Sequence, residues 1–187
     1  MTRLAALPIP AIAALNGPAA GAGVGLALAC DLRLASDQAT FMAAHTRIGL
    51  HLGWGASYFL PRVVGLPKAL ELSWSTEIVD AAEALRVGLV NRVFASGVFA
   101  DEVRLFAARL AAAPRNSVRL AKRALVRSAG SSLAQCLVAE IEDQERCWAS
   151  ADSAEGLAAF TDKRPPRFTG GIESPDEPPV AAARHFE

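Results

Sequence analysis

A glycine-rich segment contains the residue types best suited to chemistry. Residues 16–31 read NGPAAGAGVGLALACD, in which Gly21, Gly23 and Gly25 interrupt small and apolar residues. A helix that begins within this segment leaves its first backbone N–H groups unpaired, and its dipole favours negative charge there. The glycines let the backbone approach whatever carries that charge. We therefore expect an anion, or an oxygen that becomes negative during a reaction, at this loop.

The familiar glycine motifs do not fit this segment. Its spacing is GxGxG, and Leu26 stands where a dinucleotide-binding loop has its third glycine. The phosphate loop GxxxxGK[ST] and the nucleophile elbow GxSxG are absent from the sequence. A purely structural glycine turn is therefore an alternative interpretation.

Histidines are the other candidates for chemistry. An imidazole titrates near neutrality, so His45 is a candidate acid or base, and His51 is a second one. The alternative for His45 is a polar side chain hydrogen-bonded within a loop. The cysteines, Cys30, Cys136 and Cys147, lack metal-type spacing, and no HExxH motif is present. We predict no metal site, and reduced thiols typical of a cytoplasmic protein.

The composition limits the possible partners. The 187 residues have a formal net charge of +0 and 52% of them are hydrophobic, which argues against a nucleic-acid or membrane-surface partner. Residues 11–29 form the longest apolar stretch, but Asn16, Pro18 and glycines interrupt it, so we expect no membrane span. The first residues also lack the pattern of a signal peptide.

Several local patterns predict the elements that position these residues. An apolar run at 11–15 predicts a buried strand, and residues 24–30 predict a buried helix. Asp80 and Glu83 predict the start of a helix by a capping box. The further expected elements are extended segments at 32–35 and 39–42 and helices at 56–64, 67–74, 98–113, 117–128, 132–149 and 153–162.

The chain is expected to fall into an α/β part at 1–95 and a helical part at 96–170. Asp152 and Glu155 are predicted to form the cap of the last helix. Beyond it, residues 171–187 are acidic and rich in proline, and a disordered tail is predicted there.

Three longer strings point to a family. NGPAAGAGVGLALACDLRLAS, LPRVVGLPKALEL and DAAEALRVGLVNRVF occur in an order that resembles the crotonase (enoyl-CoA hydratase/isomerase) superfamily, over residues 9–170. The resemblance implies a crotonase-like ββα spiral core and a C-terminal helical trimerisation region. It also implies homotrimers or hexamers, an acyl-CoA thioester substrate, and no cofactor apart from the CoA of that substrate. Family members carry roughly 70–90 further residues before this point, so we expect an N-terminally shortened α/β core.

The resemblance also assigns roles to particular residues. The backbone amide of Ala22 corresponds to an oxyanion-hole donor, which holds the thioester oxygen as an enolate forms. Gly25 and His45 stand at the positions of the two hydratase glutamates, and Gly53 stands where some isomerases have an aspartate. The substrate-binding positions implied are Gly21, Gly23, Gly25, Trp54, Phe160 and Lys163.

Two classes of function follow. The first is a lyase or isomerase of the hydratase/isomerase type, which forms an enolate at Ala22 with His45 as the acid/base. The absence of the usual carboxylates favours the alternative, a non-catalytic acyl-CoA-binding homologue. A helical oligomer subunit would explain the second half of the chain but not the glycine loop.

Overall fold

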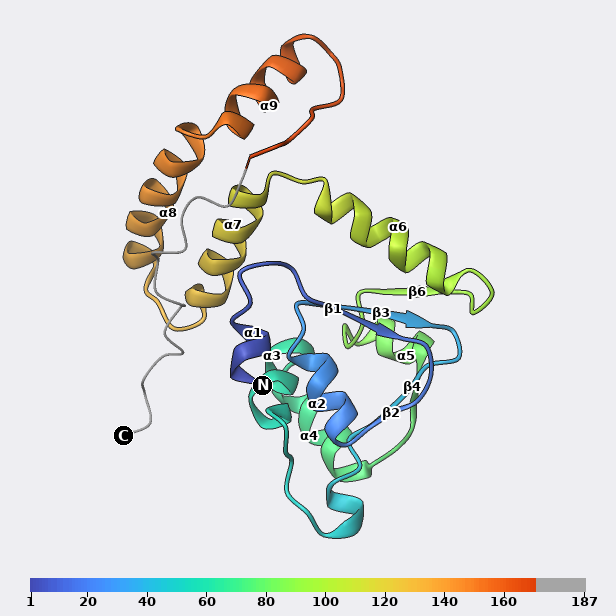
Figure 1. Ribbon diagram of the computed structural model, residues 1–187. Helices are drawn as coiled ribbons and strands as arrows, with labels where there is room; N and C mark the ends of the chain where they lie inside the picture. Colours follow the sequence, from blue (N-terminus) through green and yellow to red (C-terminus); the bar gives the residue numbers. More distant parts are fainter. Residues whose placement is uncertain (171–187) are drawn as a thin grey trace. The chain divides into compact units, whose positions relative to one another are not determined.

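The structure, a computed structural model, describes residues 1–170 and divides into two units (Figure 1). Unit 1 comprises residues 1–7 and 11–107, and unit 2 comprises residues 8–10 and the described chain from 108 onward. The predicted fold class is confirmed, since an α/β part is followed by helices. The predicted disordered tail at 171–187 lies outside the described residues.

Two three-stranded sheets run through unit 1 (Figure 1). The first has the order β1-β3-β6 and is parallel, and its strands are β1 (Ile12–Leu15), β3 (Leu32–Ser36) and β6 (Arg92–Phe94). The second pairs β4 in parallel with β2 and antiparallel with β5, and its strands are β2 (Ala19–Ala20), β4 (Thr40–Met42) and β5 (Val79–Asp80). The chain passes from the first sheet to the second twice, through residues 16–18 and 37–39. The sequence did not predict β2, β5 or β6, because strands of two or three residues carry too little pattern.

Helices pack beside these sheets and enclose the core of unit 1. They are α1 (Thr2–Ala5), α2 (Ala22–Leu28), η1 (Thr46–Ile48), α3 (Ala56–Val64), α4 (Leu66–Ser75) and α5 (Ala81–Arg86). Helix α2 packs on α3, and α3 packs on α4. The core cluster includes Leu28 of α2, Phe41 of β4 and Leu60 of α3, each at most 3% exposed. Removing this apolar surface from water is the main force that holds the helices on the sheets.

A buried arginine ties the first sheet to the chain that leads into β6. Arg33 is 6% exposed, and its Nε and Nη1 atoms donate to the carbonyl oxygens of Leu89 (2.8 Å) and Cys30 (2.9 Å). Its backbone N–H donates to Oδ1 of Asn91, and the Asn91 N–H donates to the Arg33 carbonyl. Burial lowers the pKa of the guanidinium, and the carbonyl contacts compensate for part of the lost hydration.

Half of the predicted capping box is present, because Asp80 caps the helix while the Glu83 carboxylate accepts from the Arg86 guanidinium instead of from the Asp80 N–H. Asp80 is the N-cap of α5, and its Oδ1 accepts the backbone N–H of Glu83 at 2.8 Å. We expect Asp80→Ala to lower the free energy of unfolding by about 1 kcal/mol, because one N–H of the first turn loses its acceptor. Denaturant unfolding measures this change. Asp101→Ala, which removes a first-turn carboxylate and its exposed ion pair with Arg104 but no cap hydrogen bond, is the control, and an equal loss in both variants would contradict the capping role.

Unit 2 is built from helices, namely the end of α6 (Phe99–Ala111) and α7 (Arg115–Ser128), α8 (Leu133–Trp148) and α9 (Ala151–Thr161). The predicted cap of the last helix is wrong. Ser150 is its N-cap, with Oγ accepting the Ser153 N–H at 3.2 Å, while the Asp152 carboxylate is buried and accepts other amides. None of the helices within residues 1–170 is long and apolar enough to cross a bilayer.

Candidate active site

Parallel pairing of β2 with β4 creates the site. Ala19 lies opposite Phe41 and Ala20 opposite Met42, so the carboxyl ends of the two strands meet at one edge. The Gly21 N–H continues this pairing and donates to the Met42 carbonyl at 3.0 Å. The residues that follow each strand are therefore neighbours in space although more than twenty positions separate them in the sequence.

The first turn of α2 presents unpaired amides at this edge. Gly21 is the N-cap with φ 49°, a left-handed backbone that favours glycine. Its carbonyl accepts the N–H groups of Val24 (3.1 Å) and Gly25 (3.2 Å). Within residues 1–170, the amides of Ala22 and Gly23 take part in no recorded hydrogen bond, as expected for the first residues of a helix. These donors are available to a negatively charged oxygen.

His45, which follows β4, lies beside this turn. A Cβ atom placed on Gly21 would be 3.7 Å from Nε2 of His45, and one placed on Gly53 would also be 3.7 Å from Nε2. The imidazole is half-buried, and its Nδ1 is buried with no hydrogen-bond partner among the described residues. The structure thus brings the predicted acid/base residue and the predicted oxyanion donor together.

Residues 53–55, which we call the Trp54 loop, fill the space beside Gly25. A Cβ atom on Gly25 would lie 2.7 Å from both the Cβ and the carbonyl oxygen of Trp54. The position of the first family glutamate therefore has no room for a side chain in this conformation. The sequence analysis did not predict this contact. The tripeptide Gly53-Trp54-Gly55 was a signal of an unusual backbone, and in the structure Trp54 has φ 55° and Gly55 has φ 77°.

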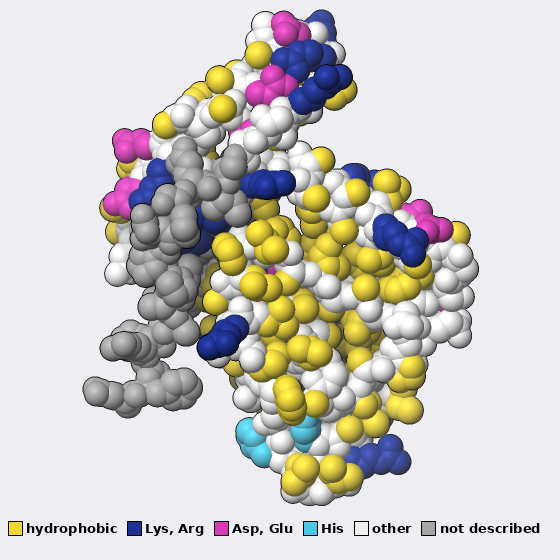
Figure 2. Space-filling view, in the orientation of Figure 1, with side chains coloured by type: hydrophobic (Ala, Val, Ile, Leu, Met, Phe, Trp, Pro, Cys, Tyr) yellow, Lys and Arg dark blue, Asp and Glu magenta, His cyan; other side chains and the backbone are white. Residues whose placement is uncertain are grey.

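His51 has a different environment from His45. It lines an open groove between α3 and α4, together with Leu66, Trp74 and other residues of these helices. Its side chain is exposed, with Nδ1 2.6 Å from the carbonyl oxygen of Leu52. Figure 2 shows the histidines of the described chain at one end of a face where hydrophobic side chains gather over unit 1. The exposed apolar residues of this unit include Leu26, Trp54, Tyr58, Leu66 and Trp74.

Phe160 and Lys163, two of the predicted substrate-binding residues, belong to unit 2. Phe160 is 84% exposed near the end of α9, and Lys163 follows that helix with φ 54°. The Lys163 N–H donates to the Phe160 carbonyl at 3.3 Å, so a tight turn connects the two residues. Both side chains are free to contact solvent or a ligand.

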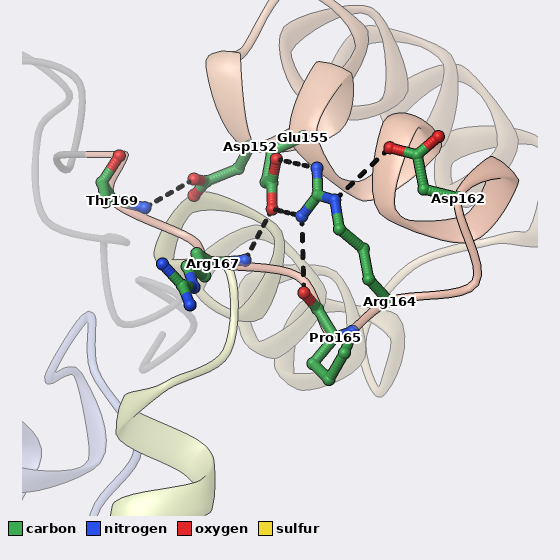
Figure 3. Close-up of polar contacts among 7 residues, drawn as sticks. All are labelled: Asp152, Glu155, Asp162, Arg164, Pro165, Arg167 and Thr169. Atoms are coloured by element: carbon green, nitrogen blue, oxygen red, sulfur yellow. Dashed lines mark hydrogen bonds and ion pairs between the residues drawn. The ribbon is translucent and has the colours of Figure 1, made fainter.

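The segment after this turn folds back along α9 (Figure 3). Glu155 accepts two bonds from the Arg164 guanidinium, at 2.7 and 2.9 Å, and the Arg167 backbone N–H at 2.7 Å. Asp152 accepts the backbone N–H groups of Thr169 (3.2 Å) and Gly170 (2.9 Å). These two carboxylates hold residues 164–170, which we call the C-terminal strap.

The pKa of Glu155 is lowered from 4.5 to about 2 by its hydrogen bonds from Arg164 and the Arg167 amide. Because the pKa is lower when the strap is bound, the ionised Glu155 carboxylate stabilises the bound strap, and this contribution is complete above pH 4.5. This contribution is lost as the pH falls toward 2. We expect the protection of the Arg167 amide, measured by NMR as its exchange rate relative to the intrinsic rate at the same pH, to decrease over that range. Glu155→Gln should abolish this pH dependence while the Asp152 contacts remain, and an unchanged profile would contradict the assignment.

The chain was compared with known proteins. The family model described as "Enoyl-CoA hydratase/isomerase" matches residues 1–171. A Rhodobacter capsulatus protein named "Probable enoyl-CoA hydratase" is 41% identical over 163 residues, covering 87% of this chain and 63% of the relative. An Arthrobacter "4-chlorobenzoyl coenzyme A dehalogenase-1" is 38% identical over 86% of this chain and 58% of its own length. The crystal structure of a Bacillus anthracis enoyl-CoA hydratase has a TM-score of 0.87 at 34% identity, covering 91% of this chain and 66% of that one. The chain thus spans less than two thirds of these curated relatives.

Proposed function

Because this chain belongs to the enoyl-CoA hydratase/isomerase family, we propose that it acts on an acyl-CoA thioester by forming an enolate. The observation that carries the proposal is the juxtaposition of the unpaired Ala22 amide with Nε2 of His45 beside Gly21. Relatives that bear the names of CoA-thioester enzymes support the substrate class. The CoA of the substrate is the only cofactor-like group that the proposal requires.

In the proposed step, Nε2 of His45 accepts the proton from the carbon next to the thioester carbonyl. The electron pair of the broken C–H bond forms a double bond to the carbonyl carbon, and the π pair of the carbonyl moves to its oxygen, which becomes an enolate oxygen. The Ala22 N–H donates to this oxygen, with the α2 dipole adding to its stabilisation. If a proton returns to the same carbon, hydrogen is exchanged with solvent. If the enolate is conjugated with a double bond and the proton returns to a more distant carbon, the double bond moves.

The absence of the paired carboxylates favours proton transfer over water addition. Placing and activating water is the work of two glutamates in the hydratases that this chain resembles. Here Gly25 has no room for such a side chain, while His45 provides one group that can accept and return a proton. We therefore propose an isomerase-type proton transfer ahead of hydration.

Proton NMR in deuterated buffer tests this proposal, with butyryl-CoA and but-3-enoyl-CoA as probes, since both carry C–H bonds on a saturated carbon next to the thioester. Deuterium entering the carbon next to the thioester is the expected result. Line broadening of the CoA signals without exchange would favour the second candidate, a non-catalytic acyl-CoA-binding homologue, which the missing carboxylates support. If neither deuterium exchange nor line broadening is observed, both candidates are contradicted.

We also propose that the chain assembles into homotrimers or hexamers and works in the cytoplasm. Exposed apolar residues along α8 support the assembly, and they are Leu133, Leu137, Val138, Ile141 and Trp148. Cys30, Cys136 and Cys147 are thiols, which suit a reducing compartment. Sedimentation velocity at several protein concentrations tests the assembly, and a species that stays monomeric throughout would contradict it.

A further inference from the structure

The fit between Gly25 and the Trp54 loop has a consequence for His45. We propose that Gly25 is a positioning residue. Because Gly25 has no side chain, the Trp54 loop can close on α2 and hold the His45 imidazole beside the Ala22 amide. This inference rests on the proposed function, since it explains how the base of that reaction is held.

The first step of the argument is steric. Non-bonded carbon atoms favour separations of about 3.5–4.0 Å, whereas a Cβ on Gly25 would lie 2.7 Å from the Cβ of Trp54 and 3.2 Å from its carbonyl carbon. The Trp54 carbonyl oxygen would also lie 2.7 Å away, and because this carbonyl group belongs to the backbone, rotating the indole cannot relieve the overlap. Any side chain at position 25 must move the Trp54 loop or α2.

The second step concerns the stiffness of the loop. The Gly53 carbonyl accepts the Ala56 N–H at 2.9 Å, and the Gly55 carbonyl accepts two N–H groups of the first turn of α3 at 3.0 Å. Trp54 has φ 55°, a conformation that bulky residues rarely adopt unless their surroundings fix it. The loop thus forms the start of α3, which itself packs on α2, and a push at Gly25 moves it as one body.

The third step links the loop to the imidazole. Nδ1 of His45 has no hydrogen-bond partner among residues 1–170, so in this part of the chain van der Waals contacts orient the ring. Cβ atoms placed on Gly21 and Gly53 would each lie 3.7 Å from Nε2, so both positions border the ring. Moving the loop away removes the Gly53 side, and the ring gains freedom relative to the Ala22 amide.

Gly25→Ala tests the inference, with Gly156→Ala as the matched control. Both variants replace a glycine inside a helix and gain similar helix propensity. They differ in available space, because a Cβ on Gly156 would lie 3.7 Å from its nearest neighbour, an atom of Phe168, which is an ordinary contact. We expect Gly25→Ala to lower kcat for deuterium exchange by about 100-fold with little change in KM, since a displacement of about 1 Å costs this much. Gly156→Ala should keep kcat and raise the melting temperature.

A second readout does not depend on activity. Carbethoxylation of each histidine by diethyl pyrocarbonate, followed by peptide mass mapping, reports access to the ring. In the unaltered chain His45 should react more slowly than the exposed His51, and Gly25→Ala should accelerate His45 relative to His51. If the unaltered chain exchanges no deuterium, the proposed function fails, and this readout alone then decides how His45 is held.

The inference is overturned if folded Gly25→Ala keeps both the kcat and the His45 protection of the unaltered chain. Should Gly25→Ala not fold, Gly53→Val replaces it, because position 53 has no positive φ and its Cβ would make an ordinary contact with Nε2. The branched carbons beyond that Cβ then displace the ring. A loss of kcat with KM retained supports the placement of His45 against position 53, on which the role of Gly25 depends, and an unchanged kcat overturns the inference.

Discussion

Replacing Ala22 with proline is expected to lower kcat for deuterium exchange by about 100- to 1000-fold while the protein stays folded. The rate falls because proline has no N–H, so the substitution removes one preorganised donor to the enolate oxygen. Ala22 is the first residue of α2, and proline is favoured at this position because its fixed φ suits the first turn. Exchange kinetics by NMR measure the rate, and circular dichroism checks the helix content.

Ala151→Pro is the matched control for this variant. Ala151 is the first residue of α9 and is exposed, so the same chemical change is made at the same helical position outside the candidate site. We expect its exchange rate to equal that of the unaltered chain. A folded Ala22→Pro protein with full activity would remove the Ala22 amide from the mechanism.

His45→Gln is expected to lower the exchange rate by about 100- to 10,000-fold, the usual contribution of a general acid/base residue. Glutamine fills a similar space between Gly21 and Gly53 but cannot accept and return a proton. Binding of butyryl-CoA, followed by line broadening, should change little.

His51→Gln is the competing variant in the same assay. His51 lines the groove between α3 and α4, whereas Nε2 of His45 lies beside the first turn of α2. A large loss of exchange in His51→Gln, with activity retained in His45→Gln, would assign the base to His51 and contradict the arrangement proposed for His45.

Local patterns in the sequence were sufficient for several features. The glycines at 21, 23 and 25 predicted a loop that opens into a helix, and α2 begins at Ala22, two residues earlier than expected. Asp80 predicted a cap that is present. These features depend on residues within about one helical turn of each other, so their physical causes are contained in the local sequence.

The tertiary structure alone decided which distant residues meet. His45 lies beside Gly21 because β2 and β4 pair in parallel with one particular register, and strands of two and three residues gave no sign of it. The Trp54 loop reaches Gly25 only because α3 packs on α2. Asp152 likewise had the spacing of a cap residue, but the C-terminal strap engages its carboxylate and Ser150 caps the helix. In each case the partner is distant in sequence, and only folding brings the two groups within contact.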